Sequence, residues 1–276
     1  MAGHLVAAGY DVLTYDPMPG VSVPGARRAH SVREVGDAAD IVLVCVPDAG
    51  ALRDVVLDEG GLAGAARVRV LVHTGTSGPE VLDELAGRVE LQIVDAPITG
   101  GVPRARTGDL TTIVAGAAEV VALVRPLLET YSAEVVVISE RAGDGQRAKL
   151  VNNLLSASNL ALACEAFVLG ERLGLDPEAL LQVVNSGSGQ NSATLTKIPD
   201  NVLPRRFNRG GRISMLLKDL DAARSEAERV AVPMPLAAAV RSAFAEAIAQ
   251  DGPDGDSTSV VRHMARAAGL EDVGRE

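Results

Sequence analysis

The sequence contains no tryptophan and only three Tyr and three Phe, so aromatic residues make up 2% of the chain. Proteins that bind single-stranded nucleic acid stack the bases on aromatic side chains. Such a binding surface is therefore not expected here. The 276 residues are 47% hydrophobic and 22% charged, as in an ordinary globular protein. The core must then be aliphatic, built from Val, Leu, Ile and Ala.

Acidic residues outnumber basic ones by 36 to 26, and long apolar runs are scarce. The formal net charge is -10, and an acidic surface repels the phosphates of nucleic acids and anionic membranes. No apolar run approaches the roughly 18 residues of a membrane span, and no signal-peptide pattern is evident. We expect a cytoplasmic protein whose partners include neither nucleic acid nor a membrane. A small anionic substrate stays compatible with this charge, because a local cationic pocket can form in an acidic protein.

Cysteine and histidine are equally sparse. Cys45 and Cys164 do not form a C-x-x-C pair, and we expect both to be buried free thiols in a reducing compartment. The four His do not belong to a cluster with metal-ligand spacing, so no metal is expected. His73 follows an expected strand, but an acidic partner at a meaningful spacing is missing, and we assign it no catalytic role.

In the first half of the chain, short β-branched runs alternate with helical patterns. Ile41–Val46 is continuously apolar, as is typical of a strand buried on both faces. Alternating strands and helices predict a doubly wound, mostly parallel sheet with right-handed crossovers. The expected strands are Val12–Tyr15, Ile41–Val46, Val68–Val72, Leu91–Val94, Thr111–Val114 and Val135–Ile138. The clearest helical patterns are Ala51–Leu57, Pro79–Leu85 and Ala118–Leu128.

The pattern changes near Arg141, after which we find no convincing strand. A long helix is expected over Gly145–Leu173, followed by helices at 178–185, 212–231, 235–250 and 257–269. The sequence therefore predicts a Rossmann-like α/β domain over residues 1–141 and an all-helical domain over residues 142–276. Because Leu150–Leu173 is more apolar than one small helical domain can bury, we expect a homodimer or homotetramer.

The chain opens with a helix, a Gly turn and a short strand that ends at Asp16. In a dinucleotide-binding fold, an acid at this place binds the adenosine ribose hydroxyls, and with Pro17 rather than Arg next to it, it favours NAD over NADP. The same fold has a central strand and a Gly-rich loop before that helix, and this chain lacks both. Their loss would leave buried sheet edges unpaired. We expect the true start to lie roughly 10–15 residues upstream; the alternative is a truncated, impaired product.

A Pro/Gly turn follows one of the expected strands, at Asp95-Ala-Pro-Ile-Thr-Gly-Gly101. An ordinary tight turn has the same composition. As a functional segment, it would offer the hydroxyl of Thr99 and the unobstructed backbone N–H groups of Gly100 and Gly101, which suit a carboxylate. The residues alone leave both interpretations open.

The start of the long helix carries Lys149 and, four residues later, Asn153, so the two share one helix face, with Asn152 adjacent. A lysine among apolar neighbours can act as a proton donor. The alternative is a solvated lysine, although a cation is disfavoured near a helix N-terminus. Lys218-Asp219-Leu220, taken alone, is typical of surface charge.

Together these segments resemble the beta-hydroxyacid dehydrogenase family (3-hydroxyisobutyrate dehydrogenase-like) over nearly the whole chain. The segment Asp95–Gly101, with Gly108-Asp-Leu-Thr-Thr112 after it, is similar to the family's D-A-P-V-S-G-G followed by G-x-L-T. The run from Gly143 to Asn153 is similar to G-x-G-x-x-x-K-x-x-N-N, and residues 218–220 to its K-D-L segment.

The resemblance implies a hydride transfer between NAD(H) and a small 3-hydroxy acid or its semialdehyde. The catalytic residues would be Lys149, as the general acid/base, together with Asn153 and Thr99. Substrate would be bound by Thr99, Gly100, Gly101 and Asn153, and cofactor by Asp16, Val46, Pro47, Thr76 and Lys218. Thr99 replaces the family's usual Ser and its methyl group narrows the pocket, while Ala51 stands where relatives often carry a polar cofactor contact.

Four other interpretations compete with this one. A glyoxylate or succinic semialdehyde-type reductase would use the same residues. A non-catalytic relative that binds nucleotide or a partner is favoured only by the missing Gly-rich loop. Imine reductases of the same fold generally lack the lysine, so Lys149 argues against them, and the helical half is too short for 6-phosphogluconate dehydrogenase.

Overall fold

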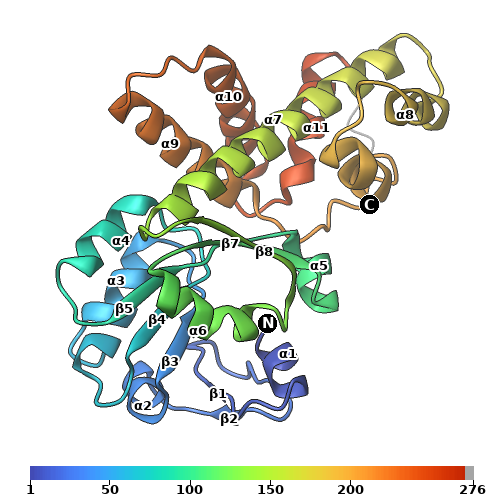
Figure 1. The fold of residues 1–276 in the computed structure, drawn as a ribbon. Helices are drawn as coiled ribbons and strands as arrows, with labels where there is room; N and C mark the ends of the chain where they lie inside the picture. The colour runs from blue at the N-terminus through green and yellow to red at the C-terminus, as the bar shows by residue number, and fades with distance from the viewer. Residues whose placement is uncertain (271–276) are drawn as a thin grey trace. The chain divides into compact units, whose positions relative to one another are not determined.

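The computed structural model describes residues 1–270, and the chain divides into two compact units, Met1–Lys149 and Leu150–Glu276. The first unit is built from strands and helices, whereas the described part of the second is helical (Figure 1). The predicted fold class, a Rossmann-type domain followed by an all-α domain, is therefore confirmed. The long helix α7, Asp144–Arg172, runs from the first unit into the second.

A six-stranded sheet forms the centre of the first unit. Its order is β3-β4-β5-β7-β6, with β8 beside β7. Strands β3, β4 and β5 are parallel, whereas β7 runs antiparallel to β5 and β6, so the sheet is mixed. The strands are β3 (Ile41–Val44), β4 (Val70–His73), β5 (Gln92–Asp95), β6 (Ile98–Thr99), β7 (Leu110–Ala115) and β8 (Ser132–Ser139).

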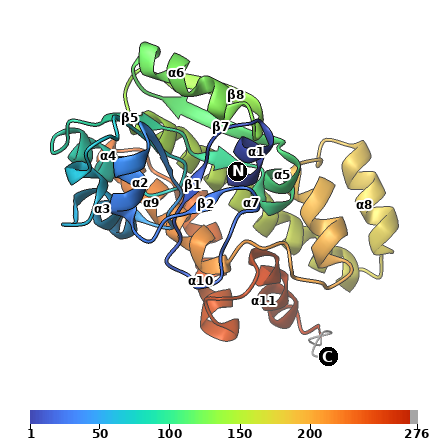
Figure 2. The same cartoon turned by 90° about the horizontal axis from the view of Figure 1, so that it is seen from below.

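Helices cover both faces of this sheet, because successive side chains of a strand point to opposite faces. In β4, Val70 and Val72 pack towards the α6 side, and Leu71 packs towards α3 and α4. Figure 2 shows α6 on one side of the strands and α2, α3 and α4 on the other. The helices of this unit before α7 are α1 (Ala2–Ala7), α2 (Val32–Ala38), α3 (Ala49–Leu57), α4 (Pro79–Ala86), α5 (Gly101–Thr107) and α6 (Ala118–Leu128). A short 3-10 helix, η1, spans Leu62–Gly64.

A separate two-stranded sheet lies at the N-terminal end of the first unit. It pairs β1 (Leu13–Thr14) with β2 (Arg27–Arg28) in parallel. Among the described residues, β1 pairs with β2 alone and β3 with β4 alone. Within residues 1–270, the two sheets are thus separate. Met1 packs against the apolar cluster on the α6 side.

The aliphatic core of the second unit surrounds α7. Cys164 and Phe167 of α7 pack with Ile198, Leu220 and Phe244 from later elements. These elements are α8 (Pro177–Ser186), the π-helix η2 (Ala193–Val202), α9 (Ile213–Arg229), α10 (Pro235–Asp251), η3 (Ser257–Ser259) and α11 (Val260–Ala267). Length and composition alone would allow α7 to cross a membrane, although the core helix of a soluble protein passes the same test.

One expectation about the thiols is wrong. Cys164 is buried as expected, but Cys45 is exposed. Strand β3 ends at Val44, two residues before the expected end at Val46. Cys45 therefore lies past the last covered position of the strand, in the loop that leads to α3.

Candidate active site

The turn after β5 brings Thr99 to a tightly constrained place. Thr99 closes β6, where it pairs with Thr111 of β7. The next residue, Gly100, has a φ of 130°, and a side chain there would meet Leu110 at 3.1 Å. Gly101 also has a positive φ, of 72°. The two glycines therefore allow the chain to turn directly after the half-buried Thr99.

Lys149 lies in the second turn of α7 and is only 8% exposed. This burial rules out the alternative of a solvated lysine. Gln146, one helical turn earlier, is fully buried, and Leu150 follows as a buried apolar neighbour. Asn153 is one turn further along the same helix face.

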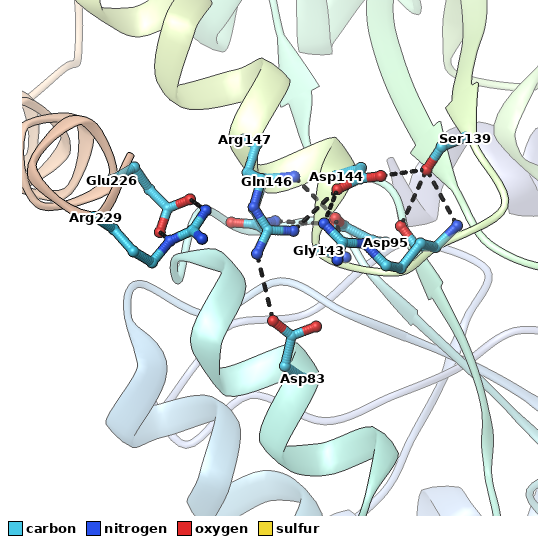
Figure 3. Close-up of polar contacts among 10 residues, drawn as sticks. Asp83, Asp95, Ser139, Gly143, Asp144, Gln146, Arg147, Glu226 and Arg229 are labelled. Carbon is cyan, nitrogen blue, oxygen red and sulfur yellow. Dashed lines mark hydrogen bonds and ion pairs between the residues drawn. The ribbon is translucent and has the colours of Figure 1, made fainter. Parts of the chain in front are cut away.

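A network of buried hydrogen bonds joins the start of α7 to the end of β5 (Figure 3). The carboxylate of Asp95 accepts hydrogen bonds from the backbone N–H groups of Gly143 at 2.9 Å and Gln146 at 2.8 Å. The side-chain amide of Gln146 donates to the same carboxylate at 2.9 Å. Burial raises the pKa of Asp95 to about 6, although the N–H donors of Gln146, Gly143 and Gly145 act in the opposite direction.

A second acid, Asp144, is the first residue of α7 and holds the start of this helix through its side chain. Its carboxylate pairs with Arg141 at 2.8 Å and Arg147 at 2.9 Å, and it accepts a hydrogen bond from Ser139 at 2.7 Å (Figure 3). The Arg141 contact, followed by the Ser139 hydroxyl, lowers the pKa of Asp144 to about 2. Arg147 also reaches Asp83 of α4 at 3.4 Å. The orientation of the helix start is thus held from two sides.

In the second unit, Asp219 joins two of the predicted site residues. Its carboxylate accepts a hydrogen bond from the side-chain amide of Asn153 at 2.6 Å and lies 3.4 Å from the ammonium group of Lys218. The Asp219 side chain is only 13% exposed. The segment 218–220 is therefore more than surface charge. Asp219 was not among the predicted site residues, although its place in the K-D-L segment was a signal.

The predicted cofactor residues follow the carboxyl ends of strands. Val46 and Pro47 come after β3, Thr76 after β4, and Asp16 after β1. Because β3 and β4 are parallel, the first three lie at one edge of the sheet, where α/β folds bind nucleotides. A side chain at Gly75 would overlap the carbonyl oxygen of Val46, so only glycine lets the backbones that follow β3 and β4 come this close together.

This edge also holds a buried hydroxyl, Ser77 Oγ, which lacks a hydrogen-bond partner within the described chain. A polar ligand at this edge would satisfy it. The carboxylate of Asp16 accepts a hydrogen bond from the backbone N–H of Met18 at 2.8 Å, which holds the loop after β1. These features fit a dinucleotide. Within residues 1–270, no group of three or more His, Cys, Asp or Glu side chains could hold a metal ion.

Two family models together cover most of the chain. Residues 1–139 match the NAD-binding domain of 6-phosphogluconate dehydrogenase. Residues 143–264 match the domain described as NAD-binding of NADP-dependent 3-hydroxyisobutyrate dehydrogenase. The fold, the strand-end residues and these matches define a nicotinamide-dependent oxidoreductase that acts on CH–OH groups.

Individual relatives agree with this class. The chain is 34% identical to 3-hydroxyisobutyrate dehydrogenase of Pseudomonas aeruginosa, over 88% of this chain and 86% of the relative. It is 29% identical to L-threonate dehydrogenase of Cupriavidus necator, with coverages of 95% and 91%. The crystal structure of 3-hydroxyisobutyrate dehydrogenase from Salmonella typhimurium is 25% identical, covers 94% of this chain and 93% of its own, and superposes with a TM-score of 0.84. The chain belongs to the beta-hydroxyacid dehydrogenase family.

Proposed function

We propose that the protein transfers a hydride reversibly between NAD(H) and a small 3-hydroxy acid or its semialdehyde, with Lys149 as the general acid/base. The observation that carries this proposal is the burial of the Lys149 side chain in a helix whose start is bonded to the substrate turn through Asp95. A buried lysine has the chemistry to move a proton, and a hydroxyl-bearing, glycine-rich turn has the donors to bind an anion.

Each residue has a separate task in this reaction. The bound nicotinamide supplies or accepts the hydride. Lys149 donates a proton to the carbonyl oxygen during reduction and accepts one from the hydroxyl during oxidation. The hydroxyl of Thr99 and the N–H groups of Gly100 and Gly101 bind the carboxylate. Asn153 orients the substrate, and its own orientation depends on Asp219.

The class of substrate is supported by the relatives. They include dehydrogenases of 3-hydroxyisobutyrate, 2-(hydroxymethyl)glutarate and L-threonate, all small hydroxy acids. A related Mycobacterium tuberculosis enzyme, 27% identical, has a structure with L-serine. L-serine, like 3-hydroxyisobutyrate, carries a hydroxyl on the carbon that is β to its carboxylate. A glyoxylate or succinic semialdehyde-type reductase stays the second candidate, because it would require the same lysine and the same turn.

We further propose that NAD is preferred over NADP. Asp16 follows β1, where a dinucleotide fold places the adenosine ribose, and its carboxylate would repel a 2′-phosphate. The remainder of the cofactor would be contacted by Val46, Pro47, Thr76 and Lys218.

Homodimerisation is proposed from the exposed apolar residues of α7. Leu155, Leu162 and Leu169 follow one another at seven-residue intervals, so they share one helix face, and each is exposed. Exposed apolar patches of this kind are typical of protein–protein contacts. We place the protein in the cytoplasm, in agreement with its two free cysteines.

The proposal is tested by turnover with NADH and NADPH against a panel of small semialdehydes, glyoxylate-like acids and the matching 3-hydroxy acids. We expect NADH-dependent reduction of at least one semialdehyde and oxidation of its hydroxy acid. A folded protein that binds NADH but turns over no member of the panel would favour the non-catalytic alternative.

A further inference from the structure

We infer that Gln146 and Asp95 are positioning residues that hold Lys149 at a fixed distance from the substrate turn. This inference rests on the proposed function, because it assigns the two residues to the same proton-transfer step. It depends on contacts that lie entirely within the first unit.

The side-chain amide of Gln146 makes four hydrogen bonds in a fully buried position. Its Nε2 donates to Asp95 Oδ1 at 2.9 Å and to the carbonyl of Gly75 at 3.0 Å. Its Oε1 accepts from the backbone N–H groups of Ser77 at 2.9 Å and Gly78 at 3.2 Å. One side chain therefore joins the loop that carries Thr76 to the strand that leads into the substrate turn.

The chain distances from this contact to the two reacting groups are short. Thr99 is four residues after Asp95, and Lys149 is three residues after Gln146, which is a rise of about 4.5 Å along α7. The Asp95 carboxylate also caps the first turn of α7 through the N–H groups of Gly143 and Gln146. The buried contact between Asp95 and Gln146 thus connects the start of α7, the substrate turn and the loop at Gly75–Gly78.

The close approach is built into the backbone. A side chain at Gly145 would meet Asp95 Oδ2 at 2.8 Å, so only glycine lets the carboxylate reach the helix. The amide of Gln146 must donate on one side and accept on the other, which a carboxylate or an apolar side chain cannot do. Exchange of the two groups, with an amide at position 95 and a carboxylate at position 146, keeps a donor and an acceptor facing each other at this contact and loses the hydrogen bond to the Gly75 carbonyl.

Other ionisable groups surround this contact. His73 of β4 is in register with Asp95 and fully buried. Asp144 and Arg147 flank Gln146 on α7 and bond to each other at 2.9 Å. These groups are unchanged in every variant below, so differences between variants at a given pH report on positions 95 and 146.

The test compares wild type, Gln146→Glu and the double variant Asp95→Asn/Gln146→Glu, with Gln92→Glu as the matched control. Gln92 is exposed at the start of β5, and its replacement by Glu makes the same change of charge.

We expect Gln146→Glu to lower kcat about 100-fold near pH 8, as a small displacement of a reacting group does. Activity relative to wild type should then rise about tenfold per pH unit towards pH 6, as the two carboxylates come to share a proton. The double variant should recover most of kcat near pH 8.

A second readout does not depend on turnover. The chain has three lysines, Lys149, Lys197 and Lys218, so protein labelled with ¹³C at the lysine ε-carbon gives three assignable NMR signals. In Gln146→Glu near pH 8 we expect the Lys149 signal to move while those of Lys197 and Lys218 stay. This readout remains valid even where no substrate is found and the proposed function itself fails.

Two results would overturn the inference. One is wild-type kcat in Gln146→Glu across the whole pH range. The other is a loss of activity in Gln146→Glu that is equal at every pH and is not recovered in the double variant, together with a Lys149 signal that does not move. This second result would assign Gln146 a role in stability alone. Both Gln92→Glu and wild type should lack the recovery at low pH.

Discussion

The side-chain amide of Asn153 donates a hydrogen bond of 2.6 Å to the carboxylate of Asp219, a residue 66 positions later in the chain. Asp219 also lies 3.4 Å from the ammonium group of Lys218. A single acid on α9 therefore orients two residues that the family resemblance assigns to substrate and cofactor. A residue that does not touch the ligand itself but hydrogen-bonds to the side chains that do commonly determines the geometry of a binding site.

Replacement of Asp219 by Asn should weaken substrate binding. The charge-assisted hydrogen bond to Asn153 is lost, and such bonds contribute about 1.5–3 kcal/mol. We expect kcat/KM for the hydroxy acid to fall roughly 10–100-fold, measured by initial rates of NADH formation. The matched control is Asp221→Asn on the same helix, which removes the partner of Arg241 and should leave kcat/KM near wild type. Equal effects of the two substitutions would contradict the role of Asp219.

Asp16 should determine the choice between NAD and NADP. In Asp16→Ser the carboxylate that would repel a 2′-phosphate is gone, so the ratio of kcat/KM for NAD over NADP should fall by about tenfold or more. The control is Asp11→Ser, which removes an exposed partner of Arg27 from the same part of the chain. An unchanged cofactor ratio in Asp16→Ser would remove Asp16 from cofactor recognition.

Asp95 should make stability depend on pH in a defined direction. Its pKa rises from 3.8 to about 6 in the folded protein, so the protonated form is favoured by folding. This contribution is fully present below pH 3.8 and is lost as the pH rises through 6. The free energy of unfolding of wild type relative to Asp95→Asn should therefore decrease by about 1–3 kcal/mol between pH 4 and pH 7.5. Urea unfolding at both pH values measures this, and a constant difference would argue against a raised pKa.

The exposed face of α7 should hold two copies of the chain together. Leu162 on this face is 66% exposed, and a charge there would have to be desolvated in a dimer. We expect wild type to have twice the chain mass of 28.5 kDa by light scattering, and Leu162→Glu to be monomeric. Leu236→Glu serves as the control, because Leu236 is 82% exposed on α10. A monomeric wild type would refute the proposed interface.

Much of the fold was predictable because hydrophobic periodicity depends on local sequence. The predicted helix Ala118–Leu128 matches α6, and the predicted helix Gly145–Leu173 is within one residue of α7 at each end. Helix α2 was missed, although Ser31 accepts a hydrogen bond from the N–H of Glu34, a capping pattern that the sequence displays. The antiparallel β6 and the π-helix Ala193–Val202 were not predictable, since neither leaves a clear periodic signal.

The candidate site was predictable only in part. Lys149 and Thr99 were found through spacing and family motifs, and the burial of Lys149 agrees with a functional role. Gln146 was not among the predicted site residues, and a glutamine in a helix ordinarily faces solvent. Its importance depends on Asp95, 51 residues earlier, and on the loop at Gly75–Gly78. Contacts between such distant segments are set by the sheet order rather than by local sequence.

The central claim is that Lys149 transfers the proton, and its most direct test is kcat for the reduction of a semialdehyde by NADH at saturating substrate. We expect Lys149→Ala to lower kcat by about 10²–10⁴, the usual contribution of a positioned general acid, while NADH still binds. Wild-type kcat in Lys149→Ala would contradict this account.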